Sequence, residues 1–486
     1  MNYNKIRISG LLPLLVMLVS MAGFMSCSDD NEVYNGPADL KVTATATGEP
    51  VTALEFNTYG GSVMITVESD APWQISVAGA PEWLKLSNTS GEATKDVEPR
   101  YIKVTAEPLG DADTRSCTIT VKSGSAVCDI AVTQEKSGVV DADGWETAVA
   151  ANNNMCAGVN LYNTLDANGD WFDPDDIVAC ETCWGQPLAK QEWFDAVAAS
   201  GFKVVRVPVT WFPHFDENRI VKEPWMNRVQ EVVNYAMNAG LYCILNVHHD
   251  TGAHDNGWVC ADYANIDDVC NKVEHLWKQI AERFRDYGEK LIFEGYNEML
   301  DPSHSWIIPT DPNVYKAVNM IAQRFVDTVR ATGGNNRNRN LIVTTYGADG
   351  GKLPLSSLEL PVDEIPGHIM VQVHNYTPYG FSNLMNDIDD DNLPTWTPEF
   401  QKELADMLDH SIEFSKATGV PIVVGECGAY DKIDEAERAK YGEFISTYAK
   451  GKAPMTVIFW GQLIDRTTCE ELYPVFIDGF LKGTEY

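Results

Sequence analysis

Basic residues are scarce in this sequence. Its 486 residues include 36 lysines and arginines against 70 aspartates and glutamates, which gives a formal net charge of −34 at pH 7. This excess of negative charge repels nucleic acids and anionic membrane surfaces, so neither is expected as a partner. A neutral polymer is not affected by this charge. The composition is therefore compatible with a protein that acts on a neutral polymer.

A second C-x-x-C pair is also lacking. Cys180 and Cys183 form a lone C-x-x-C, so the four thiolates of a zinc knuckle are not available. Which of the other cysteines pair is not deducible from their spacing. Cys243 lies inside an apolar run and is interpreted as a small core residue.

Hydrophobic residues are plentiful. They make up 44% of the chain, and the 10% that are aromatic include 13 tryptophans, so a large core can be buried and nothing indicates disorder. A chain of 486 residues exceeds what one hydrophobic core usually supports. Two folded domains behind an export segment are therefore predicted.

An export signal is predicted over residues 1–26. Lys5 and Arg7 precede an apolar run that ends at "FMSCSDDNE", where Cys27 follows a small residue. This pattern resembles a bacterial lipoprotein signal, which implies that Cys27 carries a lipid anchor; an uncleaved helical anchor is the alternative. The acidic residues after Cys27 resemble a surface-export signal. We therefore expect an outer-membrane lipoprotein at the cell surface, with residues 27–37 as a tether.

Residues 38–136 form short alternating segments separated by turns, a pattern typical of a β-sandwich. The segments "APWQISV", "EWLKLSNTSG", "RSCTITVKSG" and "IAVTQ" resemble the BACON module, which implies an Ig-like all-β fold. Trp73 and Trp83 are interpreted as core residues of a spacer domain, and glycan binding is the alternative. A polar linker, residues 137–143, follows.

From Gly144 onward, apolar runs of strand length alternate with segments of helical spacing. Eight buried strands that are each followed by a crossover predict a (β/α)8 TIM barrel over residues 144–486. The predicted strands are residues 156–161, 203–208, 241–247, 291–296, 340–346, 369–374, 421–426 and 456–461.

Polar side chains gather at the C-terminal ends of these strands, where a TIM barrel carries its active site. A single polar residue there has the alternative of being a paired structural group. A set spread over six strands indicates catalysis instead. The set is Arg206, His248, His249, Asn297, Glu298, His374, Tyr376, Glu426 and Trp460.

Two glutamates in this set suit the cleavage of a glycosidic bond. One carboxyl group must donate a proton to the leaving oxygen, and the other must be ionised to attack the anomeric carbon. The motifs "GVNLYNTLDA", "VVRVPVTW", "LNVHHD", "YNEM", "VHNYTP" and "VVGECGA" resemble glycoside hydrolase family 5, most closely its subfamily 4 of endo-glucanases and xyloglucanases. The resemblance implies that Glu298 is the acid/base and Glu426 the nucleophile.

The neighbouring side chains receive supporting roles from their chemistry and from the family pattern. Arg206 and Tyr376 are expected to keep Glu426 ionised. Asn297 is expected to bind the sugar's 2-hydroxyl group. Five further residues are expected to contact the sugar or to support the carboxylates: Asn160, His248, His249, His374 and Trp460.

Other aromatic residues and some departures from the family pattern bear on specificity. Tyr162, Cys427 and the segment "FWGQLIDR" differ from the usual subfamily residues and are expected to change the cleft walls. Five tryptophans in predicted loops are candidates for sugar platforms, each with core packing as the alternative: Trp184, Trp211, Trp258, Trp306 and Trp396.

The predicted function is that of a retaining endo-β-1,4-glucanase, active as a monomer on soluble plant β-glucans such as xyloglucan and mixed-linkage glucan. An endo-β-mannanase on the same fold and a glycan-capture lipoprotein without catalysis are the alternatives. No cofactor or metal is expected, although His248, His249 and His254 in "HHDTGAHD" raise the alternative of a structural ion. Which β-glucan is preferred stays open.

Overall fold

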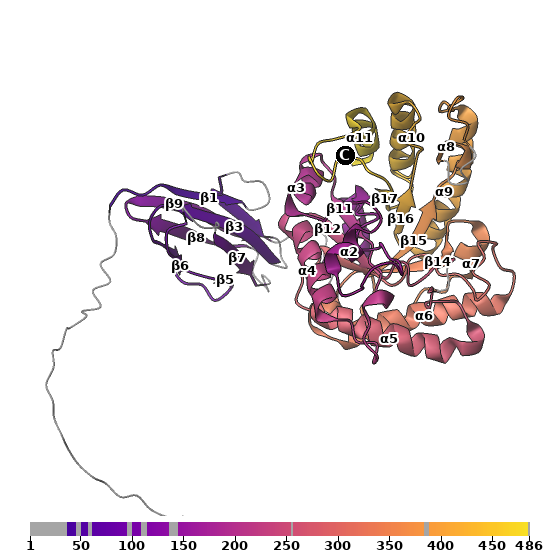
Figure 1. Cartoon of the computed structure of the whole chain (residues 1–486), viewed down its shortest axis with the longest axis horizontal. Helices are drawn as coiled ribbons and strands as arrows, with labels where there is room; N and C mark the ends of the chain where they lie inside the picture. The colour runs from indigo at the N-terminus through magenta and orange to yellow at the C-terminus, as the bar shows by residue number, and fades with distance from the viewer. Residues whose placement is uncertain are drawn as a thin grey trace, which may run out of the picture.

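The structure is a computed structural model that describes residues 36–44, 50–56, 61–94, 100–107, 114–135, 144–253, 256–382 and 388–484. The predicted signal, Cys27, most of the tether and the linker at residues 137–143 lie outside this part of the chain. The described residues form an all-β domain followed by a closed barrel of parallel strands wrapped in helices (Figure 1). The predicted fold class is confirmed.

The N-terminal domain is a sandwich of two sheets, ordered β1-β3-β7-β5 and β2-β9-β8-β4-β6. Alternate side chains point between the sheets, so Ile65 and Val67 of β3 and Ile119 and Val121 of β8 are buried. The strands are β1 (Leu40–Ala44), β2 (Ala53–Phe56), β3 (Gly61–Ser69), β4 (Trp73–Val77), β5 (Leu84–Leu86), β6 (Ser90–Gly91), β7 (Arg100–Ala106), β8 (Thr114–Ser123) and β9 (Ala126–Glu135).

Both tryptophans of the sandwich are engaged within the domain. Trp73 is buried against Gly91, where an added Cβ would lie 2.4 Å from the indole ring. Trp83 is half-buried, and the Arg115 guanidinium lies 4.5 Å from its ring centre. Neither ring is an open platform for a sugar, which favours the spacer interpretation over glycan binding by these residues.

The C-terminal domain is a barrel of eight parallel strands in chain order. Each strand lies within a predicted run or extends it by a few residues, and β14 continues furthest. The strands are β10 (Ala157–Asn160), β11 (Val204–Val207), β12 (Tyr242–Asn246), β13 (Leu291–Glu294), β14 (Leu341–Asp349), β15 (Ile369–Asn375), β16 (Ile422–Cys427) and β17 (Met455–Phe459).

Helices cover the outside of the barrel and begin and end at identifiable residues. For example, Thr397 accepts the Phe400 N–H at the start of α9, Pro398 occupies its first turn, and Gly419 ends it at φ 75°. The α-helices are α1 (Ala148–Met155), α2 (Ile177–Thr182), α3 (Gln191–Ala199), α4 (Glu223–Asn238), α5 (Ile266–Arg283), α6 (Pro312–Ala331), α7 (Lys352–Ser357), α8 (Tyr379–Ser382), α9 (Pro398–Thr418), α10 (Glu435–Thr447) and α11 (Pro474–Leu481). Short 3-10 turns are η1 (Phe212–His214), η2 (Tyr263–Asn265), η3 (Gly334–Arg337) and η4 (Lys482–Thr484).

The barrel interior has an apolar layer near the N-terminal strand ends. There α1 closes the barrel, because Ala151 and Met155 pack against inward-facing strand residues and the Asn152 side chain donates to the Ile422 carbonyl at 2.8 Å. The strand residues of this layer are Val204, Tyr242, Ile244, Ile292, Ile342, Met370, Val423 and Ile458.

A polar layer lies directly above the apolar one. Side chains along a strand return to the same face every two residues, so the next inward positions follow the apolar layer by two. On β11, β12, β13, β14 and β15 these positions hold fully buried polar residues: Arg206, Asn246, Glu294, Thr344 and Gln372. Apolar packing thus closes the barrel at the N-terminal ends of its strands. The polar and charged residues lie closer to the C-terminal ends, where a TIM barrel carries its active site.

None of the helices in the described residues is both long enough and apolar enough to cross a membrane. No disulfide joins the ten cysteines among them.

Candidate active site

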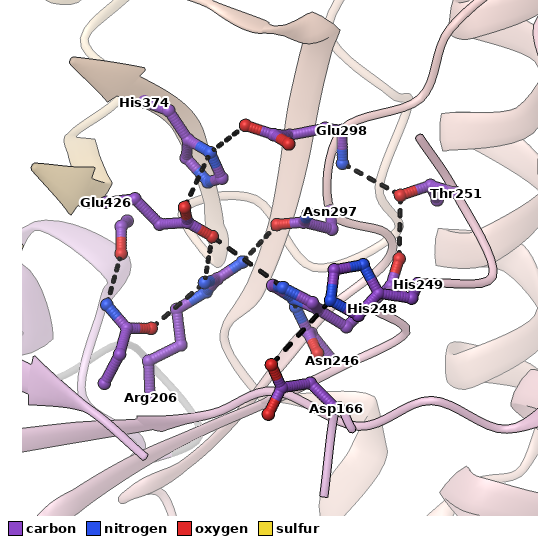
Figure 2. Close-up of polar contacts among 12 residues, drawn as sticks. Asp166, Arg206, Asn246, His248, His249, Thr251, Asn297, Glu298, His374 and Glu426 are labelled. Carbon is purple, nitrogen blue, oxygen red and sulfur yellow. Dashed lines mark hydrogen bonds and ion pairs between the residues drawn. The ribbon is translucent and has the colours of Figure 1, made fainter. Parts of the chain in front are cut away.

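The two predicted catalytic glutamates meet at the C-terminal end of the barrel (Figure 2). Glu298 follows β13 and Glu426 lies in β16. An oxygen of each carboxylate lies within 4.8 Å of the other and of a ring nitrogen of His374. A glycosidase that places a water between its carboxylates separates them by roughly 6.5–9.5 Å. The nearest oxygens of Glu298 and Glu426 are closer than this, a spacing that suits direct attack by one carboxylate.

His374 links the two carboxylates. Its Nδ1 lies 2.7 Å from Glu298 Oε1 and 3.6 Å from Glu426 Oε2. The backbone N–H of Glu298 donates to Thr251 Oγ1 at 3.1 Å, which fixes this residue from the opposite side. Glu298 is held at both its backbone and its side chain, as a proton donor of defined position requires.

Arg206 lies next to Glu426 as a fully buried cation. Its Nη1 donates to Glu426 Oε1 at 2.8 Å and to Asn160 Oδ1 at 3.0 Å. Its Nη2 donates to Asn297 Oδ1 at 2.7 Å, which orients that amide so that its Nδ2 remains as the donor for a sugar hydroxyl. Asn160 donates in turn to the Gly425 and Phe459 carbonyls, so its observed role is structural support.

Both oxygens of Glu426 accept hydrogen bonds. Arg206 donates a hydrogen bond to one oxygen, and the Tyr376 hydroxyl donates to the other at 2.7 Å. The pKa of Glu426 is raised above its usual value, by burial first and also by the charge of Glu298, and the charges of His374 and Arg206 only partly offset that rise. The pKa of Tyr376 is raised well above its usual value by burial and then by the charges of Glu426 and Glu298, so this hydroxyl stays protonated as a donor. Glu426 therefore has the donors that an ionised nucleophile needs.

Comparison with known proteins agrees with this arrangement. Residues 165–461 match the model of a family described as cellulase, glycosyl hydrolase family 5. The chain belongs to glycoside hydrolase family 5. Residues 72–135 match the BACON model, described as a putative N-terminal binding domain.

Relatives and solved structures of this family cover most of the chain. A xyloglucan-specific endo-β-1,4-glucanase of Bacteroides ovatus is 30% identical over 99% of this chain and 98% of its own length. Endoglucanase A of Ruminococcus albus is 35% identical over 68% of this chain and 91% of its own. The structure of a family 5 enzyme from Prevotella bryantii B14 matches with a TM-score of 0.65 and 36% identity, over 72% of this chain and all of that one. The chain is thus a glycoside hydrolase.

Glu294 is a second buried carboxylate of the family 5 site that sequence reasoning missed. Arg206 donates to it through Nε at 2.7 Å and Nη2 at 2.8 Å, and Asn246 adds a third hydrogen bond at 2.9 Å. Burial alone would raise the pKa of Glu294, but the Arg206 charge and these hydrogen bonds outweigh it and lower that pKa. The available signal was a glutamate inside the apolar run "LIFEGY", two residues after Ile292 on the same strand face.

The two adjacent histidines of the family 5 site have different surroundings. His248 Nε2 lies 4.0 Å from Glu426 Oε1, and its ring stacks parallel to Trp460 with centroids 5.5 Å apart. His249 lies beside Asp166, with Nε2 3.8 Å from Oδ2, and packs on Trp184. His248 thus lies next to Glu426, whereas His249 faces Asp166 (Figure 2).

Two groups of side chains in the described residues are close enough to hold an ion. One contains Asp166, His248 and His249, and the other is the catalytic group of Glu298, His374 and Glu426. His254, named in the ion alternative, lies outside the described residues. Hydrolysis by paired carboxylates requires neither group to bind a metal.

For two of the five candidate tryptophans the structure decides in favour of core packing. Trp211 and Trp396 are buried in the barrel domain, because their apolar rings pack between the strands and helices. Trp258 is half-buried, and the Arg219 guanidinium lies 4.6 Å from its ring centre. Trp184 is half-buried as well, and Trp306 is the one of the five that is 54% exposed.

Proposed function

We propose that this family 5 enzyme is a retaining endo-β-1,4-glucanase that hydrolyses soluble plant β-glucans by double displacement. The observation that carries the proposal is the separation of less than 4.8 Å between carboxylate oxygens of Glu298 and Glu426, with Arg206 and Tyr376 donating to the latter. Retaining glycosidases use this close pairing because one carboxylate itself attacks the sugar.

The reaction proceeds in two displacements. A Glu426 oxygen forms a bond to the anomeric carbon as the bond to the leaving oxygen breaks, and Glu298 gives its proton to that oxygen. Glu298, now ionised, takes a proton from water, whose oxygen attacks the anomeric carbon and releases Glu426. Glu298 thus acts as the acid in the first displacement and as the base in the second.

Xyloglucan is the proposed preferred substrate. A Bacteroides ovatus relative aligned over nearly the whole chain is described as xyloglucan-specific, and the Prevotella bryantii enzyme has been crystallised as a mutant with a xyloglucan tetradecasaccharide. Other structural relatives are described as broad-specificity endoglucanases, so mixed-linkage glucan is proposed as a second substrate.

Release of reducing ends tests the substrate assignment. The purified protein should act fastest on xyloglucan, more slowly on barley β-glucan and glucomannan, and least on galactomannan, whose backbone differs at the 2-hydroxyl that Asn297 is expected to bind. Fastest release from galactomannan would identify a mannanase. Binding to these polymers without any release would identify a glycan-capture protein.

The proposed cellular location is the outer-membrane surface, with Cys27 as the lipid attachment point. Replacing Cys27 with alanine should move the protein from the membrane fraction to the soluble fraction, because the acyl chains supply the membrane affinity. Fractionation of cells that produce each form measures this. Ser26→Thr, next to the cysteine, serves as the control for signal damage. Unchanged fractionation of Cys27→Ala would favour a helical anchor.

The BACON domain is proposed to be a spacer. Every catalytic side chain in the described residues comes from the barrel, so a chain that starts at Asp141 should keep the full-length kcat/KM on soluble xyloglucan. Affinity electrophoresis in xyloglucan gels should also show equal retardation of both forms. Weaker retardation of the shortened chain would show that the domain binds glycan.

A further inference from the structure

A buried amide contacts the histidine of the catalytic group and has no role in the mechanism described above. Gln372, on β15 two residues before His374, is fully buried in the polar layer of the barrel. Its Nε2 lies 3.3 Å from Nε2 of His374. The same amide hydrogen-bonds to the Glu294 carboxylate, one of the contacts that, against the effect of burial, lower the pKa of Glu294. Gln372 therefore connects the buried Glu294 to the histidine beside the acid/base residue.

The carboxylate of Glu294 determines which end of the Gln372 amide faces it. Because the pKa of Glu294 is lowered despite its burial, the carboxylate is ionised and can only accept hydrogen bonds. It must therefore be met by the NH2 group of the amide and not by its oxygen. That group carries two hydrogens, so the second one is free to point at Nε2 of His374.

The oxygen end of the amide is poorly accommodated. Oε1 of Gln372 is buried and has no hydrogen-bond partner among the described residues. It faces Gly425, the residue before the nucleophile, where an added Cβ would lie 2.3 Å from this oxygen. A buried acceptor without a partner destabilises a fold, so the amide has to be explained by the contacts of its NH2 group.

Asn246, on β12, makes the same pair of contacts with Glu294 and a histidine. Its Nδ2 donates to Glu294 Oε1 at 2.9 Å and lies 3.0 Å from Nδ1 of His248. The orientation of this amide is fixed independently, because its Oδ1 accepts the Val209 N–H at 3.1 Å. One buried carboxylate thus orders two amides, and each amide presents an N–H to a histidine near a catalytic glutamate.

A donor at Nε2 fixes the tautomer of His374. A neutral imidazole has one N–H and one bare nitrogen, so Nε2 accepts from Gln372 and the ring hydrogen lies on Nδ1. Nδ1 then donates to Glu298 Oε1 at 2.7 Å (Figure 2). With Oε1 occupied as an acceptor, the acidic proton of Glu298 is carried by Oε2, from which it can pass to the leaving oxygen.

The other tautomer of His374 would disable the acid. With the ring hydrogen on Nε2, the bare Nδ1 would accept a hydrogen bond from the protonated Glu298, and the proton would point at the ring and not at the substrate. The N–H of Gln372 disfavours this tautomer, because two hydrogens would then meet between the amide and the ring.

We propose that Gln372 is a positioning residue that holds His374 in the tautomer with hydrogen on Nδ1, and so keeps the proton of Glu298 available to the leaving group. This inference rests on the proposed function, because it concerns the acid step of the first displacement. Gln372 is fully buried and acts only through His374. Sugar leaving groups therefore depend on Gln372, whereas leaving groups that need no proton do not.

Gln372→Met, which keeps the length of the side chain and removes the donor, tests this with two substrates. On the β-glucan that the unaltered enzyme cleaves fastest, kcat/KM should fall about 10²-fold, because the acid step is impaired. On a dinitrophenyl cello-oligosaccharide, whose leaving group needs no proton, kcat/KM should stay within about threefold of the unaltered value. Initial rates measure both, and retained activity on the second substrate also shows that the variant is folded.

The tautomer is measured directly by 15N NMR of protein labelled in its histidine rings, because protonated and bare ring nitrogens have distinct chemical shifts. The signals that disappear in His374→Asn assign those of His374. The unaltered protein should show hydrogen on Nδ1 and a bare Nε2. Gln372→Met should show hydrogen on Nε2.

Thr344→Val provides the matched control. It removes another buried hydrogen bond of the polar layer, from Thr344 Oγ1 to the Tyr296 carbonyl at 2.9 Å, which involves no catalytic histidine. Its ratio of the two kcat/KM values should match that of the unaltered enzyme. Equal losses on both substrates in Gln372→Met, no loss on β-glucan, or hydrogen on Nε2 of His374 in the unaltered protein would overturn the role of Gln372. If the unaltered enzyme cleaved neither substrate, the proposed function would fail instead, and the NMR spectrum would still report the tautomer.

Discussion

Glu298→Ala is expected to stall as a glycosyl-enzyme when it is given an aryl cello-oligosaccharide, and azide should release it as the β-glycosyl azide. An aryl leaving group needs no proton, so the first displacement still occurs, whereas the second lacks its base. On polysaccharide the same variant should lose about 10²–10⁴-fold in kcat/KM, because the sugar leaving group does need the proton. Product configuration by NMR and intact-protein mass measure these outcomes.

Glu426→Ala should give the opposite stereochemistry. With no nucleophile, azide enters from the vacant face and yields the α-glycosyl azide, and no covalent intermediate accumulates. Both glutamates lie near Nδ1 of His374, and each variant keeps one of the two carboxylates for comparison. A β-azide from Glu426→Ala, or net inversion by the unaltered enzyme, would overturn the assignment of roles.

Arg206→Met is expected to lower kcat/KM on the order of 10³-fold, because the nucleophile loses its fixed cation. The substitution also leaves two buried carboxylates, Glu294 and Glu426, without their charge partner. Removing one member of a buried ion pair costs roughly 3–5 kcal/mol of unfolding free energy. Urea unfolding and initial rates measure the two effects. Activity within about tenfold of the unaltered enzyme would contradict the role given to Arg206.

The pH dependence of this loss has a defined sign. In the unaltered protein the pKa of Glu294 is lowered, so its contribution to stability is present above the unfolded pKa and is lost as pH falls through the folded pKa. Without Arg206, no nearby cation offsets the effect of burial, so the pKa of Glu294 in the folded variant rises. The variant therefore loses most stability at pH values where Glu294 is ionised in the unfolded chain. The stability deficit of Arg206→Met should therefore shrink as pH is lowered from 7 toward 4.5.

Arg228 provides a matched control for Arg206. It is partly buried and forms a two-point ion pair with the fully buried Glu181, with Nε to Oε2 at 2.7 Å and Nη2 to Oε1 at 2.9 Å, between α4 and α2. Arg228→Met should lower stability while kcat/KM is retained, because no catalytic carboxylate depends on it. Equal losses of activity in both arginine variants would indicate that the effect of Arg206 is only structural.

The sequence by itself determined the architecture and placed the two predicted catalytic glutamates at the barrel mouth. Strand-length apolar runs separated by helical segments leave few arrangements other than a parallel barrel, because parallel strands buried on both faces require crossovers. In that barrel a carboxylate at the C-terminal end of a strand or just after it lies at the mouth, so the positions of Glu298 and Glu426 followed from the strand pattern. These inferences depend on local periodicity, which the sequence shows directly.

Only the tertiary structure decided how the remaining residues share the site. Glu294 sits in an apolar run, and nothing local shows that it meets Arg206 across the barrel. Trp211, Trp396 and Trp306 were all candidates for sugar platforms on sequence grounds. Trp211 and Trp396 are buried, whereas Trp306, whose ring lies next to Gly347, is exposed. Burial of a loop side chain and the partner of a buried charge depend on contacts between segments far apart in the chain, and periodicity carries no information on those contacts.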